Sequence, residues 1–321
     1  MRLMTALLAG LCVASAAGPA FADTYPDRPI TLVVPYPPGG ATDPIARTFA
    51  SKLNEAWGVP VIIENKPGAG TTIGMQHVAR AKPDGYTIIM GTTSVGTNPA
   101  LYENLPYDTI KDFSYLSRAG VLQIVAITNP KVPVKSLAEL IAYAKKNPAK
   151  LNYSSAGNGT ITHLTAEYFK ASAGVDMVHV PYKGSSAAVT AVVSGEADVS
   201  FDTYFTSQPF ITADRIDVLA SAGPARMISM PDLPTLGETF PGFTAFSWLG
   251  FMGPAGMPPE IVEKWSAEVR RIAALPDVKE RLGAAGVEAG GTTPQEFVNF
   301  VQAEIAKWTK VVAEGNIPKV Q

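Results

Sequence analysis

The chain has 321 residues, of which 46% are hydrophobic, 17% are charged and 9% are aromatic. This apolar content excludes a wholly disordered chain, and the length indicates about two domains of roughly 150 residues each. With 26 Lys and Arg against 28 Asp and Glu, the net charge of −2 gives no electrostatic signature of binding to nucleic acid or an anionic membrane. Cys12, the single cysteine, excludes a disulfide framework and a cysteine-rich metal site.

The first 22 residues have the pattern of a secretory signal peptide. Arg2 supplies a positive charge, residues 6–17 are apolar, and a small-x-small sequence ends at Ala22. About 12 apolar residues are too few to cross the roughly 30 Å hydrocarbon core of a membrane. Leu11 precedes Cys12, whereas a lipidated cysteine needs a small residue at that position. We therefore expect cleavage after Ala22, export to the periplasm and a mature chain without cysteine.

Downstream of the signal peptide, strand and helix patterns alternate. The first unit predicts strands over 30–34, 61–63 and 86–90 and helices over 43–57 and 72–81. We expect Asp43 at the N-cap of the first helix and Pro44 at its first helical position. The order β-loop-α-β indicates a parallel sheet with right-handed crossovers.

A second unit of the same kind begins near Asn129. It predicts a helix capped by Ser136, strands over 152–154, 177–180, 198–201 and 217–221, and helices over 161–171 and 186–194. Apolar residues three or four positions apart then predict two C-terminal helices over about 261–272 and 297–312. We interpret the aromatic residues of these helices as core.

Two predicted strands, 122–128 and 246–252, have no helix paired with them and flank the second unit. If both cross between domains, the first domain comprises residues 23–124 plus 250–321, and the second comprises residues 125–249. Such a division is typical of a hinge architecture in which loops of both domains line a cleft.

Ligands of open α/β sheets bind beyond the carboxyl ends of strands, where four loops of this chain lie. The loop over 36–43 contains consecutive glycines, Gly39 and Gly40, whose backbone amides can point at an anion. Asp43 at its end would repel an anion. It either caps the helix or accepts a hydrogen bond from a ligand amine, a ligand hydroxyl or a bridging water.

The loop over 154–160 offers hydroxyls, an amide side chain and backbone N–H groups that its glycines leave accessible. It lies just before a helix N-terminus, whose positive end favours binding of an oxyanion. It lacks the lysine of a phosphate-binding loop, so a carboxylate fits better than a phosphate. The loops over 91–94 and 181–184 add hydroxyls and Lys183. Asp202 follows its own strand, where it either lines the cleft or caps a helix.

The chain lacks the patterns of common catalytic sites. Its histidines, His77, His163 and His179, show neither i, i+4 spacing nor the HExxH motif of a zinc site. No G-x-S-x-G nucleophile motif occurs. We interpret His163, in the first turn after the glycine loop, as a residue that either belongs to the helix end or orients this loop. We therefore expect no enzyme activity, no cofactor and no metal.

Several spaced motifs together resemble the substrate-binding proteins of the tripartite tricarboxylate transporter family, also called the Bug family of extracytoplasmic receptors. The motifs are PYPPGGATD at 35–43, NKPGAG at 65–70, KPDGY at 82–86, YSSAGNGT at 153–160 with His163, and HVPYKG at 179–184. The resemblance covers essentially the whole mature chain. It implies a type II periplasmic-binding-protein fold, with two α/β domains joined by a two-strand hinge. It also implies delivery of a small carboxylate to a membrane permease without a chemical step.

The resemblance further implies that the first loop and the glycine loop grip a ligand carboxyl, partly through backbone amides and water. The ligand-binding residues expected from it and from the other loops are Tyr36, Gly39, Gly40, Ala41, Thr42, Asp43, Thr92, Thr93, Ser94, Ser155, Asn158, Gly159, Thr160, Tyr182 and Asp202. We expect a monomer that binds no nucleic acid. Two alternatives stay open: a ligand-sensing subunit for a membrane signalling partner, and an exported hydrolase or isomerase that uses Asp43, Asp202 or His163.

Overall fold

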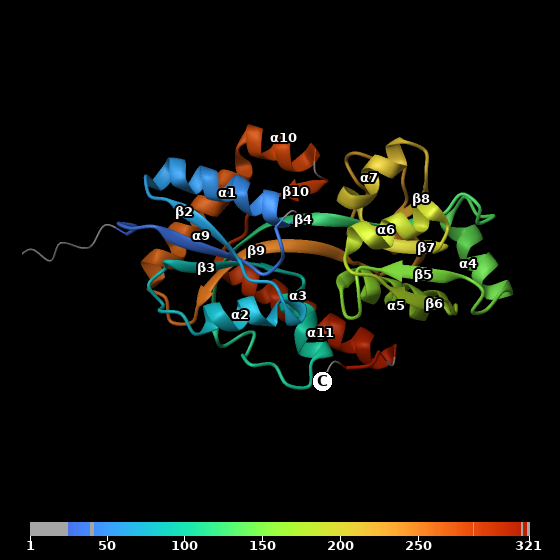
Figure 1. Cartoon of the computed structure of the whole chain (residues 1–321), viewed down its shortest axis with the longest axis horizontal. Helices are drawn as coiled ribbons and strands as arrows, with labels where there is room; N and C mark the ends of the chain where they lie inside the picture. The colour runs from blue at the N-terminus through green and yellow to red at the C-terminus, as the bar shows by residue number, and fades with distance from the viewer. Residues whose placement is uncertain (1–24, 39–41, 285, 316, 320–321) are drawn as a thin grey trace, which may run out of the picture.

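A computed structural model describes residues 25–38, 42–284, 286–315 and 317–319. They form two α/β halves that lie side by side along the long axis of the molecule, with strands in the middle and helices on both faces (Figure 1). The predicted signal peptide and the loop residues Gly39, Gly40 and Ala41 lie outside the described residues.

The first half combines the N-terminal part of the chain with its C-terminal part. Its elements are β1 (Ile30–Val34), α1 (Thr42–Trp57), β2 (Val61–Asn65), a 3₁₀ turn η1 (Ala69–Thr71), α2 (Thr72–Ala79), β3 (Thr87–Thr92), α3 (Ser94–Leu101), β9 (Phe246–Pro254), α9 (Pro259–Ala274), α10 (Pro276–Ala284), β10 (Val287–Ala289) and α11 (Pro294–Glu314).

The second half is one continuous stretch of chain. Its elements are α4 (Leu137–Lys146), β5 (Asn152–Ser155), α5 (Ile161–Ala173), β6 (Val178–Pro181), α6 (Ser185–Ser194), β7 (Val199–Thr203), α7 (Tyr204–Thr212), β8 (Asp217–Ser221) and α8 (Leu236–Thr239). The long strand β4 (Phe113–Thr128) contributes to both halves (Figure 1).

Most predicted elements are confirmed within a few residues, but the predicted N-cap of the first helix and the predicted start of β4 are wrong, and the elements α3, α7, α8, α10 and β10 were not predicted. The helix α1 begins at Thr42, so Asp43 lies in its first turn and the predicted N-cap position is wrong. The helix α3 was not predicted, because Gly96 and Pro99 weaken its helical pattern. The strand β4 begins at Phe113, well before the predicted start at residue 122.

The strands form a single sheet in the order β2-β1-β3-β9-β4-β7-β5-β6, with β10 and β8 also paired to β4. The pairs β1–β2, β1–β3, β5–β6 and β5–β7 are parallel, as the β-loop-α order predicts. The strand β4 is antiparallel to its neighbours β9, β7, β8 and β10. Two parallel units are therefore joined through an antiparallel centre.

The register of the central strands makes the two parallel units face each other. Thr92, the last residue of β3, pairs with Leu249 of β9, which pairs with Gly120 of β4. Thr203, the last residue of β7, pairs with Ile124 of β4, and β7 runs in the direction opposite to β3. At about 3.3 Å per residue, the two carboxyl ends converge from opposite sides on a segment of β4 roughly 13 Å long.

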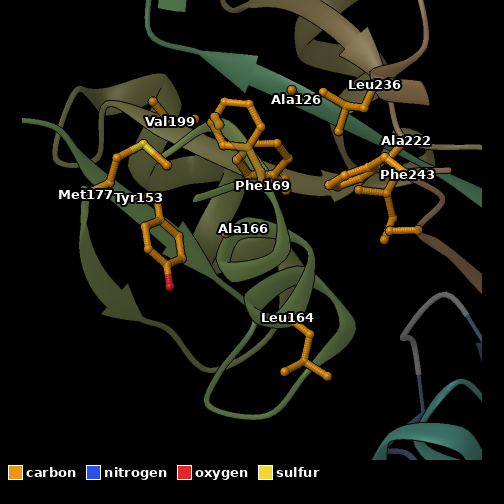
Figure 2. Close-up of a cluster of buried hydrophobic side chains, with 14 of the residues drawn as sticks. Ala126, Tyr153, Leu164, Ala166, Phe169, Met177, Val199, Ala222, Leu236 and Phe243 are labelled. Atoms are coloured by element: carbon orange, nitrogen blue, oxygen red, sulfur yellow. The ribbon is translucent and has the colours of Figure 1, made fainter. Parts of the chain in front are cut away.

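The hydrophobic core lies on both faces of the sheet. One buried cluster packs α5 against β4, β5 and β7, and Figure 2 shows part of it, including Phe169, Leu236 and Phe243. Trp308, near the end of α11, belongs to this cluster although its helix starts in the first half. Its ring meets that of Tyr168 edge-on at 6.4 Å between centroids. The helix α11 therefore packs against both halves.

Candidate functional site

Hydroxyl groups form a chain at the carboxyl ends of β1 and β3. The Tyr36 hydroxyl lies 2.8 Å from Thr92 Oγ1, which lies 3.0 Å from Ser94 Oγ. Thr71 Oγ1 donates to Ser94 Oγ at 2.8 Å. Burial raises the pKa of the Tyr36 phenol, so this group stays a neutral hydrogen-bonding hydroxyl. The structure thus joins three predicted site residues and adds Thr71, which directly follows the NKPGAG motif and ends the turn η1.

Asp43 is buried in the first turn of α1, where its charge is compensated. Arg47 donates from Nε to Asp43 Oδ2 at 2.8 Å, one helical turn away. Asn65 Nδ2 donates to Asp43 Oδ1 at 3.1 Å and to the backbone carbonyl of Tyr36 at 3.0 Å. The carboxylate raises the pKa of Arg47, which keeps the guanidinium charged. Because the guanidinium offsets the carboxylate, an anion beside this loop meets less repulsion than the sequence suggested.

Thr93 connects the loop after β3 to the central strand β9. Its Oγ1 accepts a hydrogen bond from the backbone N–H of Trp248 at 3.0 Å and donates to Ser247 Oγ at 3.3 Å. Its backbone carbonyl accepts from the N–H groups of Gly96 and Thr97 at the start of α3. The hydroxyl of Thr93 is therefore bonded to β9, whereas the hydroxyls of Thr92 and Ser94 belong to the chain that includes Tyr36.

The glycine loop after β5 is held largely by its own hydrogen bonds. The N–H of Gly157 donates to Ser155 Oγ at 3.2 Å, and the N–H of Thr160 donates to the Gly157 carbonyl at 3.3 Å. The N–H of Ala156 donates to Thr162 Oγ1 at 2.8 Å. The sequence analysis assigned the backbone amides of this loop to an oxyanion. In this structure, these three amides donate hydrogen bonds that maintain the shape of the loop. Asn158, at the tip, is exposed.

Three stacked rings lie behind the glycine loop. The imidazoles of His163 and His179 are 4.0 Å apart between centroids with an interplanar angle of 7°, and Tyr153 stacks on His179 at 4.8 Å. The N–H of Gly159 donates to His163 Nδ1 at 3.1 Å, which confirms the predicted alternative that this histidine orients the loop. The role of His179 was missed, because only the fold places β6 beside β5.

Tyr182 directly follows β6 and Asp202 lies within β7, and both of these strands pair with β5. The N–H of Tyr182 donates to the Ser155 carbonyl at 2.9 Å, while its phenol is only half-buried. Asp202 lies within β7 and is fully buried; its Oδ1 accepts from the N–H of Thr203 at 2.7 Å. In the described part of the chain, Asp202 Oδ2 has no hydrogen-bond partner. Burial raises the pKa of Asp202 to about 6, against smaller opposing effects of Ser185 and Thr203.

We expect Asp202→Asn to stabilise the ligand-free protein at pH 7.5 and to leave its stability unchanged at pH 4. The folded state holds the Asp202 proton more tightly than the unfolded state, so wild-type stability falls as the pH rises from about 4 to about 6. Above that range the buried charge costs up to about 3 kcal/mol, which the amide avoids. Denaturant unfolding at both pH values measures the difference.

The exposed Asp214, in the same half, supplies the control for this measurement. Asp214→Asn should shift the free energy of unfolding by less than about 0.5 kcal/mol at either pH. Equal effects of Asp202→Asn at pH 4 and pH 7.5 would show that the carboxyl of Asp202 is not held in an unfavourable site.

The two walls of the candidate site approach each other at two points. A Cβ atom on Gly159 would lie 2.9 Å from Leu101 Cδ1, so the glycine loop lies against α3 of the first half. A Cβ atom on Gly286 would lie 2.9 Å from the ring of Tyr204 in the second half. The two halves therefore contact each other at the glycine loop and next to Tyr204.

The described residues contain neither a metal-binding cluster nor a membrane-spanning helix. Among them, no three or more His, Cys, Asp or Glu side chains are arranged so that they could bind a metal ion. None of the helices in the described ranges is long and apolar enough to cross a lipid bilayer.

A family model described as the tripartite tricarboxylate transporter family receptor matches residues 45–317. Among curated proteins, BugT of Bordetella pertussis is 34% identical to this chain over 318 residues, which are 97% of this chain and 98% of BugT. The similarity thus extends over nearly the full length of both sequences.

Three solved structures have the same fold over nearly their whole length. R. palustris Rpa4515 with adipate is 34% identical, with a TM-score of 0.84 over 92% of this chain and 100% of that chain. The periplasmic binding protein BugD is 31% identical, with a TM-score of 0.80 over 92% and 100%. MatC (Rpa3494) from Rhodopseudomonas palustris with bound malate is 32% identical, with a TM-score of 0.79 over 90% and 100%.

Proposed function

This chain belongs to the tripartite tricarboxylate transporter receptor family, and on this premise we propose that it binds a small carboxylate between its two halves and delivers it to a membrane permease. The predicted fold is correct: the chain has the two-domain α/β architecture of the Bug-type binding proteins. The family consists of receptors, so the chain is a receptor and not the hydrolase or isomerase considered above.

The observation that carries the proposal is the convergence of two parallel-strand units on one segment of β4. Ligands of such sheets bind beyond the carboxyl ends of the strands, and here those ends point at each other from β3 and β7. A ligand between them would be contacted from both halves at once. The adipate and malate bound by two similar receptors support a carboxylate as the ligand class.

We assign the two walls of the site as the sequence predicted them. The first wall comprises the loop after β1 and the hydroxyls beyond it: Tyr36, Gly39, Gly40, Ala41, Thr42, Asp43, Thr92, Thr93 and Ser94. The second wall comprises Ser155, Asn158, Gly159, Thr160 and Tyr182, with Asp202 below. The net charge of −2 is compatible with an anionic ligand, because hydroxyls and backbone amides bind a carboxylate without a surplus of cations.

The cellular setting and domain division are part of the same proposal. Receptors of this kind include the periplasmic BugD, and the signal-peptide pattern at residues 1–22 supports export of this chain to the same compartment. We propose a monomer with domains over 23–124 plus 250–321 and over 125–249. Closure of these domains would exclude water from the ligand carboxyl and strengthen its hydrogen bonds.

A thermal-shift screen against a panel of carboxylates tests the proposal. A ligand at 100 times its dissociation constant adds about 2.7 kcal/mol, which raises the melting temperature of a domain of this size by roughly 5–10 °C. Adipate and malate belong in the panel, with adipamide as a control that keeps the length of adipate but lacks its charge. If no carboxylate in a broad panel raises the melting temperature, the proposed ligand class is wrong.

A further inference from the structure

The glycine loop is attached at both of its ends to the pair of stacked histidines behind it. At the end near β5, Ser155 Oγ lies 2.7 Å from His179 Nε2. At the end near α5, the N–H of Gly159 donates to His163 Nδ1 at 3.1 Å. The two rings stack on each other at 4.0 Å, so the loop is connected from end to end through one rigid pair of side chains.

The bond at Gly159 exists in only one protonation state of His163. A backbone N–H can only donate, so Nδ1 must present a lone pair, and the proton of the neutral ring is on Nε2. In an imidazolium both ring nitrogens carry protons, and the Gly159 N–H would then face another donor. Protonation of His163 therefore breaks this bond, whereas the hydroxyl of Ser155 can accept from a protonated His179.

We propose that His163 and His179 are positioning residues that hold the glycine loop in its ligand-binding shape, and that protonation of His163 releases the Gly159 end of this loop. The proposal has two parts that are tested separately. The effect on ligand affinity, called the ligand arm, rests on the proposed function; the effect on the shape of the loop, called the loop arm, does not. Acidic conditions would then weaken the grip of the second wall on a ligand while the rest of the fold persists.

The surroundings of the ring pair decide its charge. His163 is 7% exposed, and burial, followed by the proximity of His179, lowers its pKa to about 4. Burial also lowers the pKa of His179. On α5, Glu167 opposes this effect and Lys170, 2.9 Å from Glu167 Oε1, reinforces it. Both rings are therefore neutral near pH 7.

The remaining groups around the pair come from other elements. The Tyr153 hydroxyl of β5 donates to Glu167 Oε1 at 2.5 Å, and the apolar Leu101 of α3 lies next to Gly159. A cavity of about 500 Å³ borders the pair, and its lining includes Glu167, both histidines and Lys319 of the C-terminal tail. This space is large enough for water, which gives protons a route to the rings.

Two substitutions of His163 distinguish the effect of its hydrogen-bond acceptor from the effect of its aromatic ring. His163→Asn keeps an acceptor near the place of Nδ1 and cannot be protonated in this pH range. His163→Phe keeps a ring that stacks on His179 but leaves the Gly159 N–H without its acceptor. His77→Asn, at an exposed histidine outside the loop, is the control. Melting temperatures at pH 7.5 establish that all three variants are folded.

The loop arm uses ligand-free protein labelled with [15N]glycine and [15N]histidine. We expect His163 Nδ1 to give the signal of an unprotonated nitrogen at pH 7.5, and the Gly159 amide signal to move together with it as the pH is lowered toward 4. In His163→Asn the Gly159 signal should resemble wild type at pH 7.5 and no longer move. A protonated Nδ1 at pH 7.5, or a Gly159 signal unaffected by His163→Phe, would overturn the proposal.

The ligand arm measures adipate and malate affinity by calorimetry at pH 7.5 and at pH 4, where about half of His163 is protonated. We expect His163→Phe to bind about tenfold more weakly than wild type at pH 7.5 and His163→Asn to bind as wild type does. Only wild type and His77→Asn should weaken at pH 4 beyond the change seen in His163→Asn, which corrects for titration of the ligand. If neither ligand binds wild type, the choice of ligand fails while the loop arm still decides the inference.

Discussion

Gly159→Val is expected to weaken carboxylate binding at least 100-fold while leaving the protein folded. Gly159 has a φ of +73°, which a β-branched residue rarely adopts, and its Cβ would lie 2.9 Å from Leu101 Cδ1. Leu101 is buried, so it has little room to move away from the two methyl groups of valine. The loop must therefore shift, and the N–H of Gly159 leaves His163. Calorimetry with any carboxylate that stabilises wild type measures the loss.

Gly174→Val is the matched control for this experiment. The glycine loop leads into the helix α5, and Gly174 is the C-cap at the other end of this helix. Gly174 has a φ of +61°, but no atom lies within 4 Å of its Cβ position. Both variants thus carry a similar backbone strain, and only Gly159→Val displaces the loop. We expect Gly174→Val to melt at a lower temperature but to bind as wild type does. Retained affinity in Gly159→Val would contradict the proposed role of the glycine loop.

The corresponding substitution in the first wall is Gly40→Val, which lies outside the described residues. The sequence alone predicts a loss of binding there, because consecutive glycines let backbone amides point at the ligand.

Trp308→Ala is expected to lower the free energy of unfolding by about 3–5 kcal/mol, which is the usual cost of removing a large buried aromatic side chain. Trp308 has no exposed surface, packs edge-on against Tyr168 and donates from Nε1 to Glu304 Oε2 at 3.0 Å. The substitution also removes the indole donor from a buried carboxylate. Thermal unfolding followed by circular dichroism should show a melting temperature lower by roughly 10 °C.

Lys310→Ala, two residues further along α11, tests whether the effect belongs to the packing of this helix. Lys310 is exposed and its ion pair with Glu314 is long, at 3.8 Å. We expect its melting temperature to lie within about 2 °C of wild type, because exposed ion pairs contribute little. A similarly small shift for Trp308→Ala would mean that the end of α11 does not hold the two halves together.

The predictable part of the fold is the part that local pattern specifies. The strands at 30–34 and 217–221 have the predicted bounds, and Ser136 caps its helix by accepting from the N–H of Glu139 at 3.2 Å. Local signals failed at α3, because Gly96 and Pro99 are poor helix formers that tertiary packing nevertheless holds in a helix. They also failed at the start of β4, whose antiparallel partners are distant in sequence.

Local pattern likewise predicted one part of the candidate site and missed another. Glycine-rich loops after predicted strands marked both walls, and His163 was interpreted as a helix-end or loop-orienting residue from its position one turn into a helix. The partners of these residues come from elsewhere in the chain. His179 reaches Ser155 because β6 pairs with β5, and Asn65 reaches Asp43 because β2 pairs with β1.

By itself, the sequence determined the class of fold, the family resemblance and the loops that carry the site, since these depend on short-range periodicity, turn chemistry and motifs. Only the tertiary structure decided that β3 and β7 point at the same segment of β4, that Arg47 neutralises Asp43, and that two neutral histidines stack behind the glycine loop. The physical reason is that strand register, burial and side-chain pairing depend on contacts between segments far apart in the chain, which local pattern does not encode.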